Sequence, residues 1–187
     1  MFPPRPTDLA HQILRNSIPE GALVIDATAG NGHDTLFLAE SVGLTGKVLA
    51  FDIQESAIAS ARSRIADAGL QDRVAWHCES HALMAEHAAS GSVSAVMFNL
   101  GYLPGEDHKL TTRTEETLAA LAAAEGLLGG KGLLSVVCYP GHDEGASEAG
   151  AVVDWMTCLP ERGWRLARYQ MLGTRNPAPF LLLASRI

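Results

Sequence analysis

The sequence predicts an α/β protein with a doubly wound sheet of about seven strands. Short apolar segments rich in Val, Ile and Leu alternate with segments of helical periodicity, which is typical of a parallel sheet covered by helices on both faces. The first two apolar segments each end in an aspartate, Asp26 and Asp52. Two further apolar segments near the carboxyl end, joined by a Pro-rich loop, predict a closing strand pair.

Each expected element follows from its pattern of apolar, capping and breaking residues. Helices are predicted over residues 8–17 with Thr7 as the cap, and over 34–41, 56–68, 81–89, 114–128 and 144–159. Strands are predicted over 23–26, 47–53, 74–78, 93–98, 133–139, 164–172 and 180–185. The run of glycines from Gly129 to Gly132 is expected to separate the fifth long helix from the strand that follows it.

Composition places the chain among ordinary globular proteins. The 187 residues are 47% hydrophobic and 19% charged, so we expect one domain over 1–187. The net charge of −7 argues against broad, sequence-independent binding to nucleic acid, although a local basic patch is compatible with it. No apolar run has the length of a membrane span, so no membrane association is expected. Cys78, Cys138 and Cys158 are widely spaced and predict reduced, buried thiols in a cytoplasmic protein.

The stretch from Asp26 to Thr35 predicts a ligand-binding turn between the first strand and the next helix. Gly30 and Gly32 permit a positive φ and a close approach of the backbone to a ligand, and the helix start turns free N–H groups to the same place. A dinucleotide fingerprint would need a third glycine at Thr35, which disfavours an NAD-linked dehydrogenase. Asp52 can accept hydrogen bonds from both ribose hydroxyls of an adenosine ligand. The stretch resembles motif I of class I S-adenosylmethionine (SAM) methyltransferases.

A second motif follows the fourth predicted strand. Asn99-Leu100-Gly101-Tyr102 is similar to the Asn/Asp-Pro-Pro-Tyr signature of methyltransferases that alkylate an amino nitrogen. The side-chain carbonyl of Asn99 and the backbone carbonyl of Leu100 can accept the amine hydrogens and fix the direction of the lone pair. Tyr102 can stack on a planar base. In the alternative interpretation, Asn99 caps a turn and Tyr102 covers the core.

Several segments together resemble one bacterial family, the YtqB/MnmM-like group long labelled rRNA methylases. These segments are Asp26–Thr35, Ser80-His81, Asn99–Gly105, Thr111-Thr112 and Tyr139–His142. The resemblance covers essentially the whole chain and implies the class I SAM methyltransferase fold, which is Rossmann-like. It also implies a SAM-dependent tRNA methyltransferase that releases S-adenosylhomocysteine (SAH). The implied reaction converts the 5-aminomethyl group of wobble (2-thio)uridine, in the tRNA anticodon stem-loop, to 5-methylaminomethyl.

The resemblance also implies roles for residues at the strand ends. Asp26 is expected to face the methionine end of SAM, directly or through water, and Asp52 to hold the ribose. Ile53 and Gln54 are expected to border the adenine, with Ser80 and His81 at its exocyclic edge. The full set expected to bind the cofactor is Asp26, Thr28, Gly30, Asn31, Gly32, His33, Asp34, Thr35, Asp52, Ile53, Gln54, Ser80, His81, Asn99 and Leu100.

Catalysis is assigned to Asn99, Tyr102 and His142, with His142 as the best candidate for a proton acceptor among His33, His81, His108 and His142. Substrate contacts are expected from Tyr102, Pro104, Lys109, Thr112, Arg113, Tyr139, His142, Arg175 and Asn176. No metal is expected, because His77 and His81 do not share a helical face. A homodimer is possible. Alternative functions are N-methylation of another amine, such as an rRNA base or a small molecule, and a non-catalytic SAM- or RNA-binding module.

Overall fold

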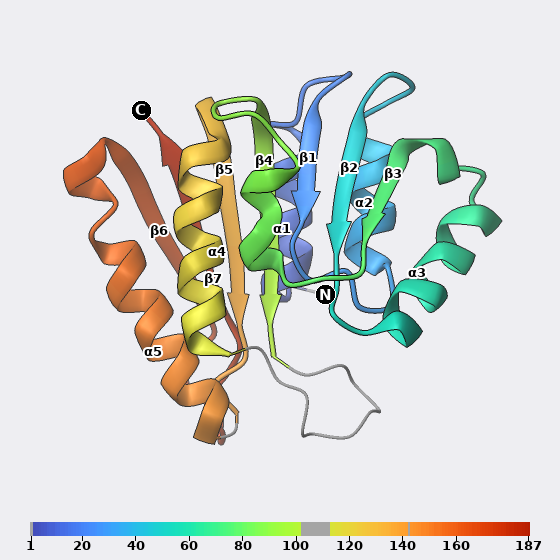
Figure 1. Ribbon diagram of the computed structural model, residues 1–187. Coiled ribbons are helices and arrows are strands. Elements are labelled where there is room, and N and C mark those ends of the chain that lie inside the picture. Colours follow the sequence, from blue (N-terminus) through green and yellow to red (C-terminus); the bar gives the residue numbers. More distant parts are fainter. Residues whose placement is uncertain (1, 102–112, 142) are drawn as a thin grey trace.

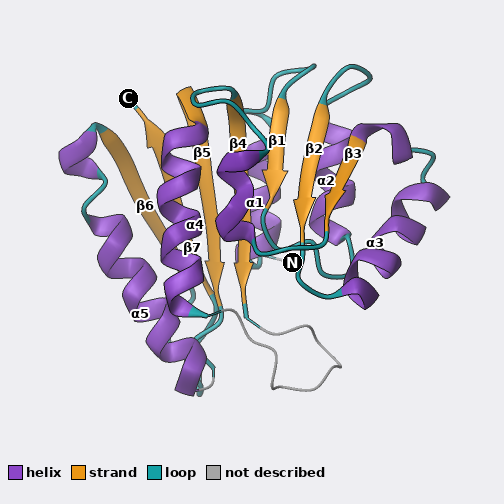
Figure 2. Ribbon diagram, in the orientation of Figure 1, coloured by secondary structure: helices purple, strands orange, loops and turns teal. Residues whose placement is uncertain are grey.

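The computed structural model describes residues 2–101, 113–141 and 143–187, which form a seven-stranded sheet between two layers of helices (Figures 1 and 2). The strands are Leu23–Asp26 (β1), Lys47–Phe51 (β2), Val74–His77 (β3), Val93–Leu100 (β4), Leu128–Cys138 (β5), Trp164–Gln170 (β6) and Phe180–Arg186 (β7). The α-helices are Pro6–Arg15 (α1), His33–Ser41 (α2), Glu55–Asp67 (α3), Thr114–Leu127 (α4) and Asp143–Thr157 (α5). Short 3₁₀ helices lie at Gln71–Arg73 (η1), His81–Glu86 (η2) and Pro160–Arg162 (η3).

The two faces of the sheet carry separate apolar cores because neighbouring residues of a strand point to opposite faces. In β1, Val24 packs in one cluster with Leu14 of α1 and Leu38 of α2. The next residue, Ile25, packs in the other cluster with Phe98 of β4 and Leu121 of α4. The helices α1, α2 and α3 cover the first face, and η2, α4 and α5 cover the second (Figure 1).

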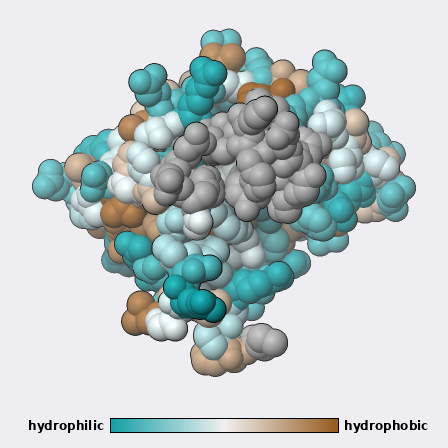
Figure 3. Space-filling view, turned by 90° about the horizontal axis from the view of Figure 1, so that it is seen from below, coloured by the Kyte–Doolittle hydropathy of each residue, from teal (hydrophilic) through white to brown (hydrophobic). Residues whose placement is uncertain are grey.

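The order of the strands places a ligand-binding edge at the middle of the sheet. The order is β3-β2-β1-β4-β5-β7-β6, with β1 to β5 parallel and β7 antiparallel to both of its neighbours. The chain reverses direction along the sheet between β1 and β4, and ligands of open α/β sheets bind at such a point, beyond the carboxyl ends of the strands. Figure 3 views this edge, where much of the described surface is hydrophilic.

The predicted fold class is confirmed, but several predicted details are wrong. α1 begins at Pro6, whose missing N–H suits the first helical position, so Thr7 lies inside the helix and does not cap it. Residues 81–86 form the 3₁₀ helix η2 in place of the α-helix predicted over 81–89. Cys138 is buried as predicted, whereas Cys78 and Cys158 are exposed. No helix in the described part of the chain is long and apolar enough to cross a lipid bilayer.

Two strands, β4 and β5, extend two or more residues beyond their predicted ranges. β5 begins at Leu128, which pairs with Val93, so the glycine run lies inside the strand. The run fits there because the register shifts after this pair and Lys131 takes a left-handed conformation with φ 71°. β4 continues to Leu100 because Asn99 and Leu100 pair with Val137 and Cys138 of β5. Asn99 is therefore held by the sheet itself and does not belong to the loop that follows.

Candidate active site

A cleft of about 1180 Å³ opens at the carboxyl ends of the central strands. Typical small-molecule sites have roughly 300–1,000 Å³, so this cleft has room for a nucleoside cofactor together with part of a second ligand. Its walls come from the ends of β1 to β4, from the start of α2 and from one side of α1. The predicted residues that line it are Thr28, Gly30, Asn31, His33, Asp34, Asp52, Ile53, Gln54, Ser80, His81, Asn99, Arg113 and Tyr139.

The remaining predicted residues fall into two groups. One group does not line the cleft: Asp26, Gly32, Thr35 and Leu100 are buried behind its wall, and Arg175 and Asn176 are exposed elsewhere. The other group, Tyr102, Pro104, Lys109, Thr112 and His142, lies outside the described residues. The predicted roles of both groups stay predictions.

The glycine turn after β1 is tied to the end of β2 by Asp52. The N–H of Gly30 donates to Oδ2 of Asp52 (2.8 Å), and the N–H of Gln54 donates to Oδ1 (2.9 Å). Gly30 and Gly32 both have positive φ values, 49° and 78°, as the motif requires. The two strand ends that the sequence singled out therefore form one backbone cradle, and the carboxylate of Asp52 lies on the cleft side of it.

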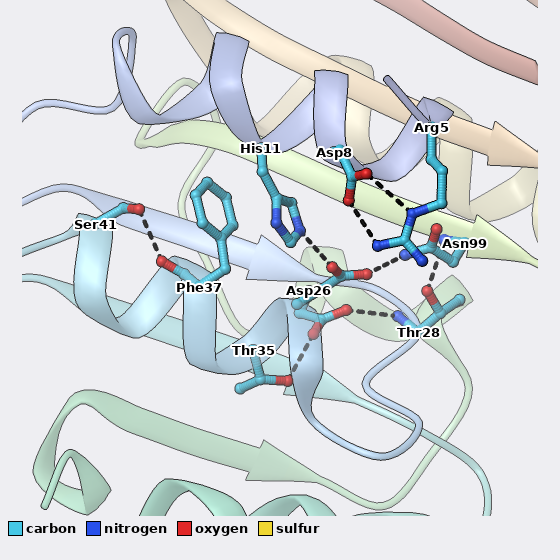
Figure 4. Close-up of polar contacts among 10 residues, drawn as sticks. Arg5, Asp8, His11, Asp26, Thr28, Thr35, Phe37, Ser41 and Asn99 are labelled. Atoms are coloured by element: carbon cyan, nitrogen blue, oxygen red, sulfur yellow. Dashed lines mark hydrogen bonds and ion pairs between the residues drawn. The ribbon is translucent and has the colours of Figure 1, made fainter. Parts of the chain in front are cut away.

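Asp26 lies beneath this turn and is fully buried. Its carboxylate accepts hydrogen bonds from the hydroxyl of Thr35 (2.6 Å) and the N–H of Thr28 (3.1 Å), as Figure 4 shows. Burial, and then the nearby charge of Asp34, raise the pKa of Asp26 to about 7. The described contacts of Asp26 thus hold the turn and the first turn of α2 together.

The raised pKa of Asp26 predicts a pH-dependent stability. Between pH 3.8 and about 7 the folded protein keeps a proton on Asp26 that the unfolded chain has lost. The free energy of unfolding contributed by this group therefore falls as pH rises through that window. We expect urea unfolding to show a smaller fall with pH in Asp26→Asn than in the wild type, and no such change in the exposed Asp67→Asn control. Parallel pH profiles for wild type and Asp26→Asn would contradict the assignment.

His81 and Ser80 line the cleft across from the glycine turn. Nδ1 of His81 lies 3.0 Å from the carbonyl of Ala27, which makes Nδ1 the protonated nitrogen of the neutral ring. Burial lowers the pKa of His81, and Nε2 is a buried acceptor with no hydrogen-bond partner among the described residues. The hydroxyl of Ser80 donates to Oε2 of Glu116 on α4 (2.8 Å). His81 thus presents a lone pair suited to an N–H donor of a ligand.

Asn99 is fixed in the wall of the cleft through both its backbone and its side chain. Its N–H donates to the hydroxyl of Thr28 (2.8 Å), and its Nδ2 donates to Oδ2 of Asp34. Because the amide nitrogen is held by Asp34, the amide oxygen has a defined position, and this Oδ1 is buried without a hydrogen-bond partner in the described part of the chain. A buried acceptor of this kind is costly unless a ligand supplies the donor.

The sequence analysis missed the wall that α1 contributes. Arg5, Asp8, His11 and Arg15 line the cleft together with Phe37 of α2. Arg5 forms two hydrogen bonds with Asp8, both 2.9 Å, and the ring of His11 stacks on Phe37 with centroids 3.9 Å apart (Figure 4). The sequence shows which side of this helix is polar, but not where that side lies in the fold. Polar residues recur at spacings of three and four along α1, opposite the buried Ala10 and Leu14.

Comparisons with known proteins place the chain in a family. Residues 48–185 match the family model described as "Putative rRNA methylase". The chain belongs to the rRNA methylase family. An Arabidopsis thaliana relative named tRNA (mnm(5)s(2)U34)-methyltransferase, chloroplastic, is 40% identical over 185 residues, covering 94% of this chain and 67% of the relative.

Two solved structures resemble this member of the rRNA methylase family over nearly their whole lengths. A protein from Clostridium thermocellum, described as a "putative rRNA-methylase", is 37% identical with a TM-score of 0.96 and full coverage of both chains. A protein from Streptococcus mutans, described as a "putative methyltransferase" and solved in complex with SAH, is 31% identical with a TM-score of 0.89, covering 98% of this chain and 99% of that one. The predicted class I SAM methyltransferase fold is therefore confirmed.

One histidine cluster in this rRNA methylase family member lies beside the cleft. Nε2 of His87 is 2.8 Å and Nδ1 of His77 is 3.4 Å from the same carboxylate oxygen of Glu79, and the three groups could hold a metal ion. The strand that holds His77 excludes a helical face shared with His81, but nothing in the sequence indicates that His87 folds back onto β3. Both histidines contact Glu79, whereas Nε2 of His77 is buried without a hydrogen-bond partner among the described residues. The absence of a metal stays a prediction.

Proposed function

We propose that the protein is a SAM-dependent N-methyltransferase that converts the 5-aminomethyl group of tRNA wobble (2-thio)uridine to 5-methylaminomethyl. The observation that carries the proposal is the amide oxygen of Asn99, a buried acceptor with no described partner in the wall of the cleft. An amine that binds there donates its hydrogens to this oxygen and is held in one direction. The name of the Arabidopsis relative supports the same substrate class.

The cofactor half of the cleft fits SAM. Asp52 offers a carboxylate for the ribose hydroxyls, and the backbone of Gly30 and Asn31 lies close by. Ile53 and Gln54 lie beyond the end of β2, where they border the adenine, and Nε2 of His81 offers an acceptor to its amino group. When bound, SAM supplies a methyl group on a positively charged sulfur, which is already activated, so the protein needs chiefly to position the amine.

The substrate half begins at Asn99 and extends along α1. Asp34, His11 and Tyr139 surround the position proposed for the amine, and the exposed Arg113 lies where it can contact a phosphate of the tRNA anticodon stem-loop. Recognition of a single-stranded loop depends on stacking and base-edge contacts, which need few cations and suit a protein with a net charge of −7. The location in the cytoplasm and the homodimer stay predictions.

The decisive experiment supplies the expected substrate. We expect mass spectrometry of nucleosides to show 5-methylaminomethyl(-2-thio)uridine after tRNA that lacks the final methyl is incubated with the protein and SAM. Binding of SAH is expected to raise the melting temperature, whereas NAD is not. Methylation of another amine in rRNA or in small molecules, without any change in the wobble nucleoside, would favour the alternative substrate. Stabilisation by NAD alone would refute a methyltransferase.

A further inference from the structure

Three cleft side chains from distant parts of the sequence form a continuous polar line. Nε2 of His11 on α1 lies 2.5 Å from Oδ1 of Asp34 on α2, and Oδ2 of Asp34 accepts from Nδ2 of Asn99 on β4. The side chains of His11 and Asp34 are 28% and 15% exposed, so both face the cleft while remaining largely enclosed. The line connects the proposed amine position at Asn99 to an imidazole that reaches solvent.

The ring of His11 is fixed in orientation. It is nearly parallel to the ring of Phe37, with an interplanar angle of 7°, and Phe37 also lies beneath the guanidinium of Arg15. Because Nε2 of His11 faces a carboxylate, its hydrogen donates to Oδ1 of Asp34, and a histidine oriented in this way holds the carboxylate in one position. The stacking and the ion pair leave His11 little freedom to turn away from Asp34.

The proposed reaction needs a proton acceptor. An alkylamine such as the lysine side chain has a pKa of about 10.4, so a primary amine at neutral pH is almost entirely an ammonium ion without a free lone pair. Methylation of nitrogen requires that lone pair, so one N–H bond of the substrate must break first. An acceptor close to Asn99 makes this possible inside the cleft, where the nitrogen is already positioned.

Three other acidic groups that line the cleft have partners elsewhere. Asp8 is paired with Arg5, Asp52 accepts from the backbone of Gly30 and Gln54, and Glu116 accepts from Ser80. Asp34 is the carboxylate that contacts the Asn99 side chain directly. This contact places Asp34 next to the nitrogen that Asn99 is proposed to hold.

We propose that Asp34 and His11 form the proton-accepting pair of the active site; this inference rests on the proposed function. The substrate ammonium binds between Oδ1 of Asn99 and the carboxylate of Asp34. One N–H bond breaks, its electron pair stays on the substrate nitrogen as the lone pair, and the proton goes to the carboxylate of Asp34, while the N–H at Nε2 of His11 donates to Oδ1 and holds that carboxylate in place. Asp34 then returns the proton to solvent.

The pair has charged and titratable neighbours on each element that packs against it. Asp8 and Arg15 flank His11 on α1, Asp26 lies beneath α2, and Tyr139 follows β5. Burial, and then the nearby charge of Asp34, raise the pKa of Tyr139. A pH profile of the wild type therefore contains several ionisations, and the proposal is tested by the difference between wild type and variant.

The test is the single-turnover rate of methyl transfer to the tRNA substrate, measured from about pH 7 to about pH 10 in wild type and His11→Gln. At neutral pH we expect Asp34→Asn to be slower by about 10²-fold or more, as is typical for loss of a general base, and His11→Gln to be slower as well because Asp34 loses the group that holds it. The deficit should shrink as pH approaches the amine pKa, because the substrate then arrives with its lone pair free. Asp34→Asn should show the same recovery at high pH.

His87→Gln is the matched control. The His87 side chain is also 28% exposed and also pairs with a carboxylate, Glu79, but His87 does not line the cleft. We expect its rate to follow the wild type at every pH. SAH-induced shifts of the melting temperature, measured on each variant, report whether the fold and the cofactor site are intact.

The outcomes separate this inference from the proposed function. A His11→Gln deficit of equal size at all pH values, or no deficit at all, overturns the proton-accepting role while the wild-type activity leaves the proposed function intact. A wild type that binds SAH but does not methylate the wobble nucleoside overturns the proposed function and this inference with it. Recovery of both variants at high pH, with His87→Gln unchanged, supports the pair.

Discussion

Asn99→Ala is expected to lower the rate of methyl transfer by about 10²-fold or more, because misplacement of the reacting nitrogen by about 1 Å has an effect of that size. The substitution removes the amide oxygen that is proposed to receive the amine hydrogens. It leaves the backbone bond from residue 99 to Thr28 in place, as well as the cradle formed by Gly30 and Asp52. The affinity for SAH should therefore change by no more than a few fold. Single-turnover kinetics and calorimetric titration with SAH measure the two quantities.

Ser135→Ala is the control for Asn99→Ala. Ser135 is fully buried in β5, and its hydroxyl, like the amide oxygen of Asn99, has no hydrogen-bond partner among the described residues. It does not line the cleft, so its removal should leave both the transfer rate and SAH binding unchanged. If Asn99→Ala weakened SAH binding as much as it slowed transfer, Asn99 would act through the cofactor and the proposed aiming of the amine would be wrong.

The part of the cleft formed by the glycine turn and the end of β2 was predictable from the sequence because it depends on local patterns. A buried β-branched segment, an aspartate at its end and a glycine turn are contiguous in the chain, so Gly30, Asp52 and their neighbours could be named without coordinates. The parallel order of the strands then brings these ends to one edge. His81 was found for the same reason, since it follows the third strand.

The α1 wall was not predicted because nothing local indicates where a helix packs. The periodicity of residues 6–15 shows which side of α1 is buried, but its position beside α2 depends on contacts with β5 and β7 at the other end of the chain. His11 therefore reaches Asp34 only in the folded protein. For the same reason the sequence did not show that Asn99 belongs to β4, because the strand extends beyond its apolar segment only where β5 supplies pairing partners. Nor did it show that Asp26 is fully buried, because the turn that covers this side chain forms only in the folded protein.

Gly32→Ala is expected to destabilise the fold strongly, because two costs meet at this position. Gly32 has φ +78°, and strain of this kind in a residue with a side chain costs about 1–3 kcal/mol. An added Cβ would also lie 2.7 Å from Cα and 2.8 Å from Cβ of Ala61 on α3. Such overpacking costs a further ~1–3 kcal/mol. The clash is with the backbone of a helix, which cannot rotate away. We expect urea unfolding to show a loss of about 2–6 kcal/mol in total.

Gly69→Ala isolates the contribution of the contact with α3. Gly69 follows that same helix and has φ +69°, but no atom lies within 4 Å of the position that its Cβ would take. In Gly69→Ala the free energy of unfolding should therefore fall only by the backbone strain of a positive φ, about 1–2 kcal/mol. The difference between the two variants measures how tightly the glycine turn is pressed against α3. Equal losses would show that the turn has room to move away from Ala61. In that case the turn would not be a rigid cradle, and the fixed positions that the proposed reaction requires of Gly30 and Asp52 would lose their structural basis.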